Sequence, residues 1–156
     1  MEITFAPRGI LQIDNARIVY RNFSGEPGKF NREGDRNFTL VIPDEELAAR
    51  LVNDGWNVKM KPARDDGDVP FMTLLIKVKF NDRGPNVYLK TGNRKIRLDE
   101  DSIDCLDRVD ILSVDLDIRP YDWEVNGKCG RTAYLQSICV TQDITDRFAE
   151  EEYPEE

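Results

Sequence analysis

The sequence contains no histidine among its 156 residues. This absence removes the commonest general base and every catalytic triad that depends on histidine. The three cysteines, Cys105, Cys129 and Cys139, are odd in number and form no CxxC pair. Their spacing fits neither a disulfide framework nor a zinc site. We therefore expect a protein that is not an enzyme and that holds no metal ion and no cofactor.

Long hydrophobic runs are also missing. No segment approaches the roughly 18 apolar residues that a membrane span needs. Residues 1–12 lack a charged flank followed by an apolar stretch, so we expect no signal peptide and a cytoplasmic location. With 40% hydrophobic and 33% charged residues, the chain is predicted to fold as one domain over residues 1–143, followed by an acidic tail over residues 144–156.

The charge is distributed unevenly along the chain. The formal net charge is -8, which argues at first against a nucleic-acid partner. Residues 8–97 nevertheless carry 17 Lys and Arg against 12 Asp and Glu, a net of +5. Residues 98–156 carry 5 against 17, a net of −12. Such asymmetry indicates nucleic-acid interaction with an acidic tail, although an acidic end can equally be a solubilising segment.

Alternating apolar and polar residues predict strands along most of the chain. The predicted strands cover residues 10–23, 37–42, 56–61, 71–80, 87–90, 95–98, 112–125 and 131–141. A kink is predicted at Asp14-Asn15 in the first strand, and hairpin turns at Gly92-Asn93 and Asn126-Gly127. The apolar phase changes after Pro120, which predicts a bulge or bend beside that residue.

One main helix is predicted over residues 44–54. Asp44 is a suitable N-cap, Leu47 and Leu51 form an apolar stripe, and Gly55 is a natural stop. Residues 99–107 allow a further capped helical turn. Together, about eight short strands and one helix predict a mostly-β fold, with a small barrel of the oligonucleotide-binding (OB) type and extra hairpins as the leading candidate.

The polar faces of these strands carry cations beside aromatic rings. Residues at i and i+2 project from the same side of a sheet, so neighbouring strands could form a basic groove. Cations neutralise phosphates and rings stack on unpaired bases, which is the chemistry of single-strand binding. The candidates are Arg21, Phe23, Lys59, Lys61, Lys77, Lys79, Tyr88, Lys90, Lys95, Arg97, Tyr121 and Trp123. The lysines could instead be ordinary solvated strand residues, and Tyr121 and Trp123 could belong to the core.

The loop between the first two predicted strands adds further candidates. It is long, contains glycine and carries Lys29, Phe30, Arg32 and Arg36. Such a loop suits a flexible flap over a DNA strand, or else a plain surface loop. Three carboxylate clusters, at residues 65–68, 99–101 and 115–117, match no metal-binding pattern and are interpreted as surface charge.

The order of features resembles the single-stranded-DNA-binding proteins of tailed bacteriophages, which are built on an elaborated OB barrel. The resemblance rests on residues 16–20 (ARIVY), residues 37–43 (NFTLVIP) leading into a helix, residues 125–128 (VNGK) and 133–135 (AYL) of the closing hairpin, and the acidic end. It implies sequence-independent coating of single strands during phage replication or recombination, without catalysis, in the cytoplasm of a bacterial host. It also implies a tail that competes with DNA and contacts replication or recombination proteins through Glu150, Glu151, Glu152, Tyr153, Glu155 and Glu156.

Other functions remain open from the sequence. The net of −12 over residues 98–156 suits a phage inhibitor that imitates nucleic acid and binds a host protein. A structural protein of a virion is a third alternative. The sequence does not decide between DNA and RNA, nor does it set the oligomeric state, a homodimer included.

Overall fold

Ten strands form one sheet in the computed structural model, which describes residues 1–29, 31–61, 71–82 and 84–144. The strands are β1 (Glu2–Phe5), β2 (Leu11–Asp14), β3 (Arg17–Asn22), β4 (Arg36–Ile42), β5 (Lys59–Lys61), β6 (Phe71–Val78), β7 (Asn86–Thr91), β8 (Arg94–Leu98), β9 (Ile111–Val125) and β10 (Lys128–Gln142). The helices are α1 (Glu45–Asp54) and two short 3-10 turns, η1 (Pro7–Gly9) and η2 (Ile103–Asp107). The predicted mostly-β class with one main helix is confirmed.

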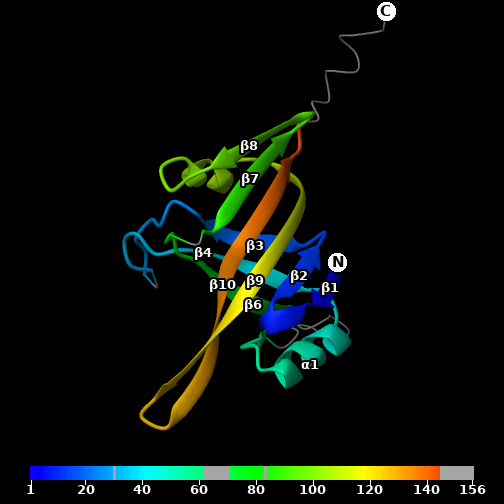
Figure 1. Ribbon diagram of the computed structural model, residues 1–156, viewed down its shortest axis with the longest axis vertical. Coiled ribbons are helices and arrows are strands. Elements are labelled where there is room, and N and C mark those ends of the chain that lie inside the picture. Colours follow the sequence, from blue (N-terminus) through cyan, green and yellow to red (C-terminus); the bar gives the residue numbers. More distant parts are fainter. Residues whose placement is uncertain (30, 62–70, 83, 145–156) are drawn as a thin grey trace, which may run out of the picture.

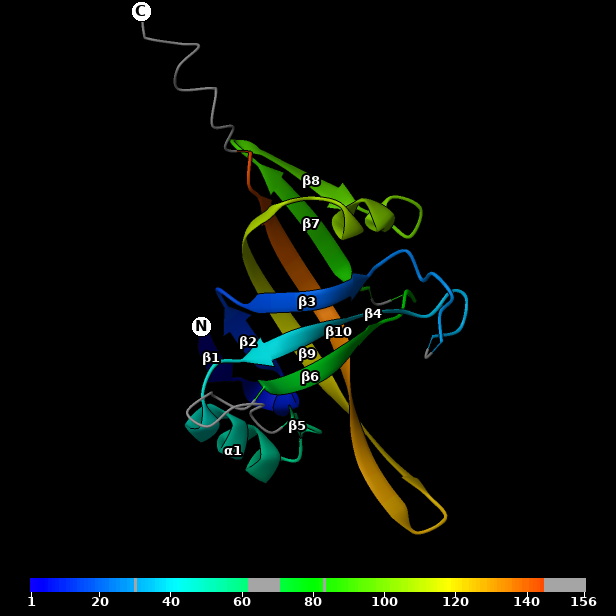
Figure 2. The ribbon, with the colours of Figure 1, turned by 180° about the vertical axis from the view of Figure 1, so that it is seen from behind.

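Strand β10 is the centre of the sheet. Its neighbours follow the order β1-β2-β9-β10-β6-β4-β3, while β7 pairs with β10 and β8, and β5 pairs with β6. In Figure 1 the long strands β9 and β10 run in front of β3, β4 and β6, and Figure 2 shows the latter three from their own side. Within the described part of the chain β1 and β3 are not paired, so the curved OB-like sheet remains open where a barrel would close.

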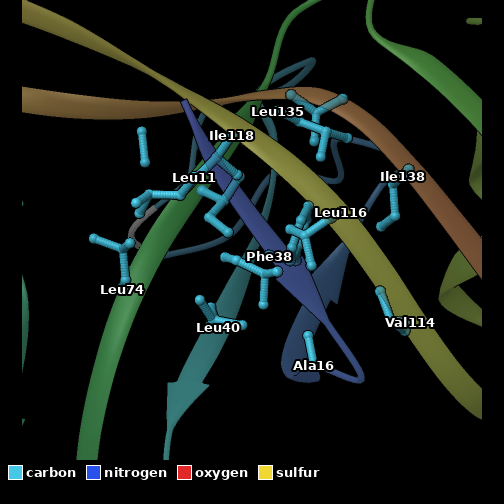
Figure 3. Packing of buried hydrophobic residues seen from close by; sticks show 14 of the residues in the cluster. Leu11, Ala16, Phe38, Leu40, Leu74, Val114, Leu116, Ile118, Leu135 and Ile138 are labelled. Carbon is cyan, nitrogen blue, oxygen red and sulfur yellow. The ribbon is translucent and has the colours of Figure 1, made fainter. Parts of the chain in front are cut away.

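The core fills the space between these two layers. Leu40 of β4, Leu74 of β6 and Leu116 and Ile118 of β9 are all buried there (Figure 3). Their alternation along each strand is the pattern that the sequence predicted. Leu112 shares the phase of the β9 residues but is exposed, and it lies where the pairing with β10 passes from Ser113 directly to Ile111.

The first predicted strand is two strands in the structure. Asn15 has a φ of 53°, and the chain turns there so that β2 pairs with β1 and β9 while β3 pairs with β4. The amide of Ala16 donates to the Val114 carbonyl at 2.7 Å, which holds the turn against β9. The predicted kink is therefore a change of neighbours. Strand β1 was not predicted.

Helix α1 follows the predicted signals. A carboxylate oxygen of Asp44 accepts a hydrogen bond from the Leu47 amide at 2.7 Å, and Gly55 ends the helix with a φ of 106°. Ala48 and Leu51 are the buried residues of the helix. The turn predicted within residues 99–107 is also present as η2.

The closing hairpin differs from its prediction in one respect. The register between β9 and β10 passes through Pro120 without a break. Its irregularities lie between Leu135 and Ser137 and between Thr141 and Gln142 on the partner strand. The bulge predicted beside Pro120 is therefore wrong in position. The phase changes there because residues 121–125 pair only with β10, beyond the reach of the core, and are all exposed. Asn126 and Gly127 both have positive φ, 52° and 80°, as the predicted type I′ turn requires.

Candidate nucleic-acid interface

A row of polar residues crosses four strands on the outer face of the sheet. In the strand register Asn37 lies opposite Lys77, Lys77 opposite Tyr134, and Tyr134 opposite Arg119. Directly paired residues project from the same side of a sheet. Their neighbours along the strands, such as Ile76, are buried on the other side. The outer face of β4, β6, β10 and β9 is therefore continuous.

A groove with a volume of about 920 Å³ opens along this face. Its basic side chains are Arg36, Lys59, Lys77 and Lys79, and its acidic ones are Asp35 and Glu100. The lysines are exposed. Four of the predicted cations thus come together, and they outnumber the carboxylates in the groove.

Arg36 already has partners in this groove. Its guanidinium lies 3.6 Å from a carboxylate oxygen of Glu100 and donates to the Glu100 carbonyl at 3.3 Å. It also lies 5.7 Å from the centre of the Phe80 ring. Because Arg36 is held in this way, the three exposed lysines are the groove's readier phosphate ligands.

Two tyrosines of the groove were not among the predicted site residues. Tyr20 is 70% exposed and has a φ of 51°, inside an irregularity of the β3–β4 register. A positive φ is uncommon outside glycine and concentrates at functional sites. The alternation of Tyr134 with buried Ala133 and Leu135 was a signal for its outward position, whereas nothing in the sequence predicted the irregularity at Tyr20.

Tyr134 lies within a cluster of side chains. The Arg119 guanidinium lies 5.1 Å from the centre of the Tyr134 ring, and Tyr121 meets that ring edge-on with the centres 6.1 Å apart. A guanidinium held over a ring is desolvated on one side and still able to bind a phosphate. The cluster therefore joins the groove to the closing hairpin.

The hairpin arm, residues 121–130, is the end of the β9–β10 hairpin and projects beyond the other strands (Figure 1). Tyr121 is 55% and Trp123 39% exposed, so neither belongs to the core. Trp123 lies opposite Gly130 in the register, and a β-carbon at Gly130 would overlap the Trp123 ring. Since the glycine leaves room for the indole against β10, Trp123 is positioned with part of its surface toward solvent.

The base of the arm is attached to the end of α1. Arg131 forms an ion pair with Asp122 at 2.7 Å, donates to the Asp54 carbonyl at 2.6 Å and lies 5.1 Å from the centre of the Trp56 ring. The hydrogen bond from Arg131 lowers the pKa of the Asp122 carboxyl. The Asp122 carboxylate is therefore charged at neutral pH, and its ion pair with Arg131 orients the arm.

Another group of predicted residues lies on β7 and β8. Lys95 Nζ lies 4.6 Å from the centre of the Tyr88 ring, and Arg97 donates to the side-chain oxygen of Asn86 at 2.6 Å. Lys90 is exposed beside them. The four predicted residues, Tyr88, Lys90, Lys95 and Arg97, do not line the groove. Lys61 is exposed at the end of β5 but does not line the groove either.

The prediction was wrong for Phe23, and Arg21 has a structural role. Phe23 is fully buried and stacks on Phe38 with the ring centres 5.0 Å apart, so no base can reach it. Arg21 donates to the carbonyls of Leu106 and Val109 at 2.8 and 2.7 Å. Phe23 therefore packs against β4, and Arg21 attaches the end of β3 to η2 and the residues after it.

The loop between β3 and β4 is anchored at its base. Asp107 accepts hydrogen bonds from the amides of Phe23 and Ser24 at 2.6 and 3.1 Å, and the Gly34 amide donates to the Gly25 carbonyl at 2.7 Å. These contacts fix the base of the loop, whereas the role of its outer part as a flap stays a prediction. Lys29 and Arg32 are exposed on it, while Phe30 lies outside the described residues.

The remaining charged segments offer no ion site in the described structure. Among described residues, no group of three or more Asp, Glu or Cys side chains could hold a metal ion. The carboxylates at positions 65, 66 and 68, and the tail residues Glu150, Glu151, Glu152, Tyr153, Glu155 and Glu156, lie outside the described part. No helix in that part is long and apolar enough to cross a membrane.

An open OB-like sheet with a basic, tyrosine-lined groove on its outer face defines a protein that binds single-stranded nucleic acid. Residues 3–155 match the family "Putative phage ssDNA-binding domain", and the chain belongs to that family. The predicted resemblance to phage single-stranded-DNA-binding proteins is thereby confirmed.

Solved structures are similar to this chain in fold. The single-stranded DNA-binding protein from bacteriophage Enc34 in complex with ssDNA has a TM-score of 0.58 at 17% identity, with 93% of each chain covered. The C-terminally truncated form of the Enc34 protein has a TM-score of 0.55 at 18% identity, with 90% of each chain covered. No curated protein sequence matches the chain. At these identities the likeness concerns the fold, so the site rests on this chain's own geometry.

Proposed function

We propose that the groove and the hairpin arm together bind single-stranded DNA without regard to sequence. The observation that carries this proposal is the continuous outer face on which Lys77, Tyr134 and Arg119 lie side by side. Lysines bind phosphates of any nucleotide, and every base has a face that can stack on a ring. This chemistry is tolerant of sequence and suits a protein that coats unpaired strands.

The same surface favours single strands over a duplex. Tyr20 and Trp123 present exposed rings, and these rings can stack only on bases that are not already paired and stacked. A duplex offers the phosphates alone, so it gains the electrostatic part of the binding and loses the stacking part. The role is binding rather than catalysis.

The biological setting follows from the family. We place the protein on unpaired phage DNA during replication or recombination, in the cytoplasm of the bacterial host. The acidic tail, with a net charge of −5 over residues 146–156, is the segment for contact with replication or recombination proteins, because phosphates repel it and basic protein surfaces attract it.

A fluorescence-anisotropy titration tests the proposal. Labelled oligo-dT and a labelled duplex of the same length are titrated with the whole chain over a range of salt concentrations. We expect tighter binding of the single strand, with a log–log salt slope of about −0.7 for each phosphate contacted. Equal affinity for both ligands, or no binding of oligo-dT at low salt, would rule the proposal out.

The position of Trp123 on Gly130 leads to a further prediction. In Gly130→Ala the new β-carbon displaces the indole ring, so we expect weaker oligo-dT binding, at most by the roughly 1–3 kcal/mol that one stacked base contributes. The change in intrinsic fluorescence on binding should shrink as well, because Trp56 is buried and Trp123 is exposed.

The matched control for this variant is Cys129→Ser, which keeps the charge, lies on the same exposed arm and leaves the Trp123–Gly130 contact intact. Because Cys129 is next to Gly130 on β10, its side chain projects to the side opposite Trp123, and the variant should bind oligo-dT as the wild type does. Both variants should keep the wild-type free energy of unfolding, since the arm lies outside the core. If Gly130→Ala binds and quenches like the wild type, Trp123 is not a stacking surface.

A further inference from the structure

A second basic surface lies on the hairpin of β7 and β8. Residues 86–98 carry four Lys and Arg and no Asp or Glu. Tyr88 pairs with Arg97 and Lys90 pairs with Lys95, so these four side chains share one side of the hairpin. We call them the β7–β8 surface. None of these four residues lines the groove or belongs to the hairpin arm.

The β7–β8 surface lies on the same outer face as the groove. Strand β7 begins beside β10, with Asn86 opposite Ser137, three residues beyond Tyr134. Leu135 and Ile138 are both buried, although simple alternation would put them on opposite sides of the strand. The register shift between Leu135 and Ser137 accounts for this, because a β-bulge at Gln136 adds one residue to the strand and resets the alternation. Tyr134 and Ser137 therefore both face outward, and the outer face continues from the groove onto β7.

Arg97 stands at the junction of the two surfaces. Its guanidinium donates to the side-chain oxygen of Asn86 at 2.6 Å, and Asn86 is the first residue of β7. Extended strands advance by about 3.3 Å per residue, so Tyr134 and Ser137 are separated by roughly 10 Å. This is a few phosphate spacings of a single strand, since successive phosphates are about 3.4 Å apart along the axis in B-DNA and farther apart when stretched.

On the β9 side of β10, two carboxylates border the outer face. Asp117 and Asp115 of β9 lie opposite Ser137 and Cys139 of β10, and they project to the same side as those residues. Two adjacent carboxylates repel phosphates. A strand that leaves the groove is thus directed away from β9 and toward β7 and β8.

Contacts on the β7–β8 surface are to phosphate rather than to bases. Its side chains are three cations and a single ring, Tyr88, which is half-buried and has Lys95 Nζ 4.6 Å from its centre. Lys90, Lys95 and Arg97 are all exposed. The surface can therefore neutralise phosphates of any sequence but contributes little stacking.

We propose that bound single-stranded DNA leaves the groove over Tyr134 and continues along β7 and β8, so that this hairpin is a second phosphate-binding subsite. The proposal rests on single-strand binding in the groove. It makes the hairpin important only for oligonucleotides that are long enough to extend beyond the groove.

A length series of oligonucleotides tests the subsite. Oligo-dT from about 4 to 24 nucleotides, a range that brackets the site sizes of OB folds, is titrated against the wild type and Lys95→Gln/Arg97→Gln. The variant should match the wild type on the shortest oligomers that bind. On long oligomers it should bind about tenfold more weakly, with a salt slope smaller by about 1.4, because two phosphate contacts are lost.

The control is Arg50→Gln/Arg108→Gln, which removes the same charge from exposed positions on α1 and after η2 and should leave every length unchanged. Lys90→Gln/Lys95→Gln repeats the test without touching the Asn86–Arg97 bond. An unchanged length dependence overturns the subsite, and so does an equal loss at all lengths. Failure of the wild type to bind any oligo-dT would instead overturn the function of the groove.

Discussion

We expect the double variant Lys59→Glu/Lys77→Glu to lose nearly all affinity for single-stranded DNA at physiological salt. Both lysines line the groove and are exposed, and each replacement substitutes repulsion for attraction at a phosphate position. Loss of two contacts alone reduces the salt slope by about 1.4. Added repulsion should bring the total loss of affinity to roughly a hundredfold or more, which an anisotropy titration with labelled oligo-dT measures directly.

This double variant should remain folded, and a second double variant controls for its change in net charge. Lys59 and Lys77 make no contribution to the core, so the free energy of unfolding should stay near that of the wild type. The pair Arg50→Glu/Arg108→Glu changes the net charge equally at exposed positions away from the groove. A similar loss in both double variants would mean that overall charge, and not the groove, governs binding.

Tyr134→Ala should have the second-largest effect. The ring lies in the groove next to Lys77 in the strand register and supports both Arg119 and Tyr121. Its removal takes away one stacking surface, worth roughly 1–3 kcal/mol, and releases a guanidinium from its position. We expect a loss of about tenfold to a hundredfold in oligo-dT affinity, which is the same free energy expressed as a ratio.

Tyr134→Phe separates the ring from its hydroxyl. It keeps the surface for Arg119 and for a base, so it should bind almost as the wild type does. Tyr134 is half-buried, and the alanine variant will lose some stability; its unfolding curve must therefore be measured, and binding compared well below the transition. Wild-type affinity in a folded Tyr134→Ala would show that the base does not stack there.

Much of the fold was predictable because burial imposes a period of two on a strand. The alternation of Leu74 and Ile76 on β6 and of Leu116 and Ile118 on β9 placed the core, and Asp44 and Gly55 marked both ends of α1. The division of the first strand was less visible. It depends on the turn at Asn15 and on pairing with strands distant in the sequence.

The site was predictable only in part. The lysines were found because they alternate with core residues, and that rule placed Lys77 correctly in the groove. It failed for Phe23, whose burial comes from stacking on Phe38 and from the anchor at Asp107. It also did not predict Tyr20, which faces the groove through a local irregularity in the pairing of β3 with β4. Such departures from regular pairing depend on tertiary contacts and leave no periodic signal.

Photo-crosslinking of the intact protein to oligo-dT that carries 5-iododeoxyuridine tests the central claim most directly, since it locates the bases on the surface. After irradiation, mass spectrometry identifies the attached residues. We predict attachment at Tyr20, Tyr134 and Trp123, which line the groove and the arm, and none at Phe5, which is exposed on β1. Attachment confined to residues outside the groove and the arm would contradict the proposed path of the DNA.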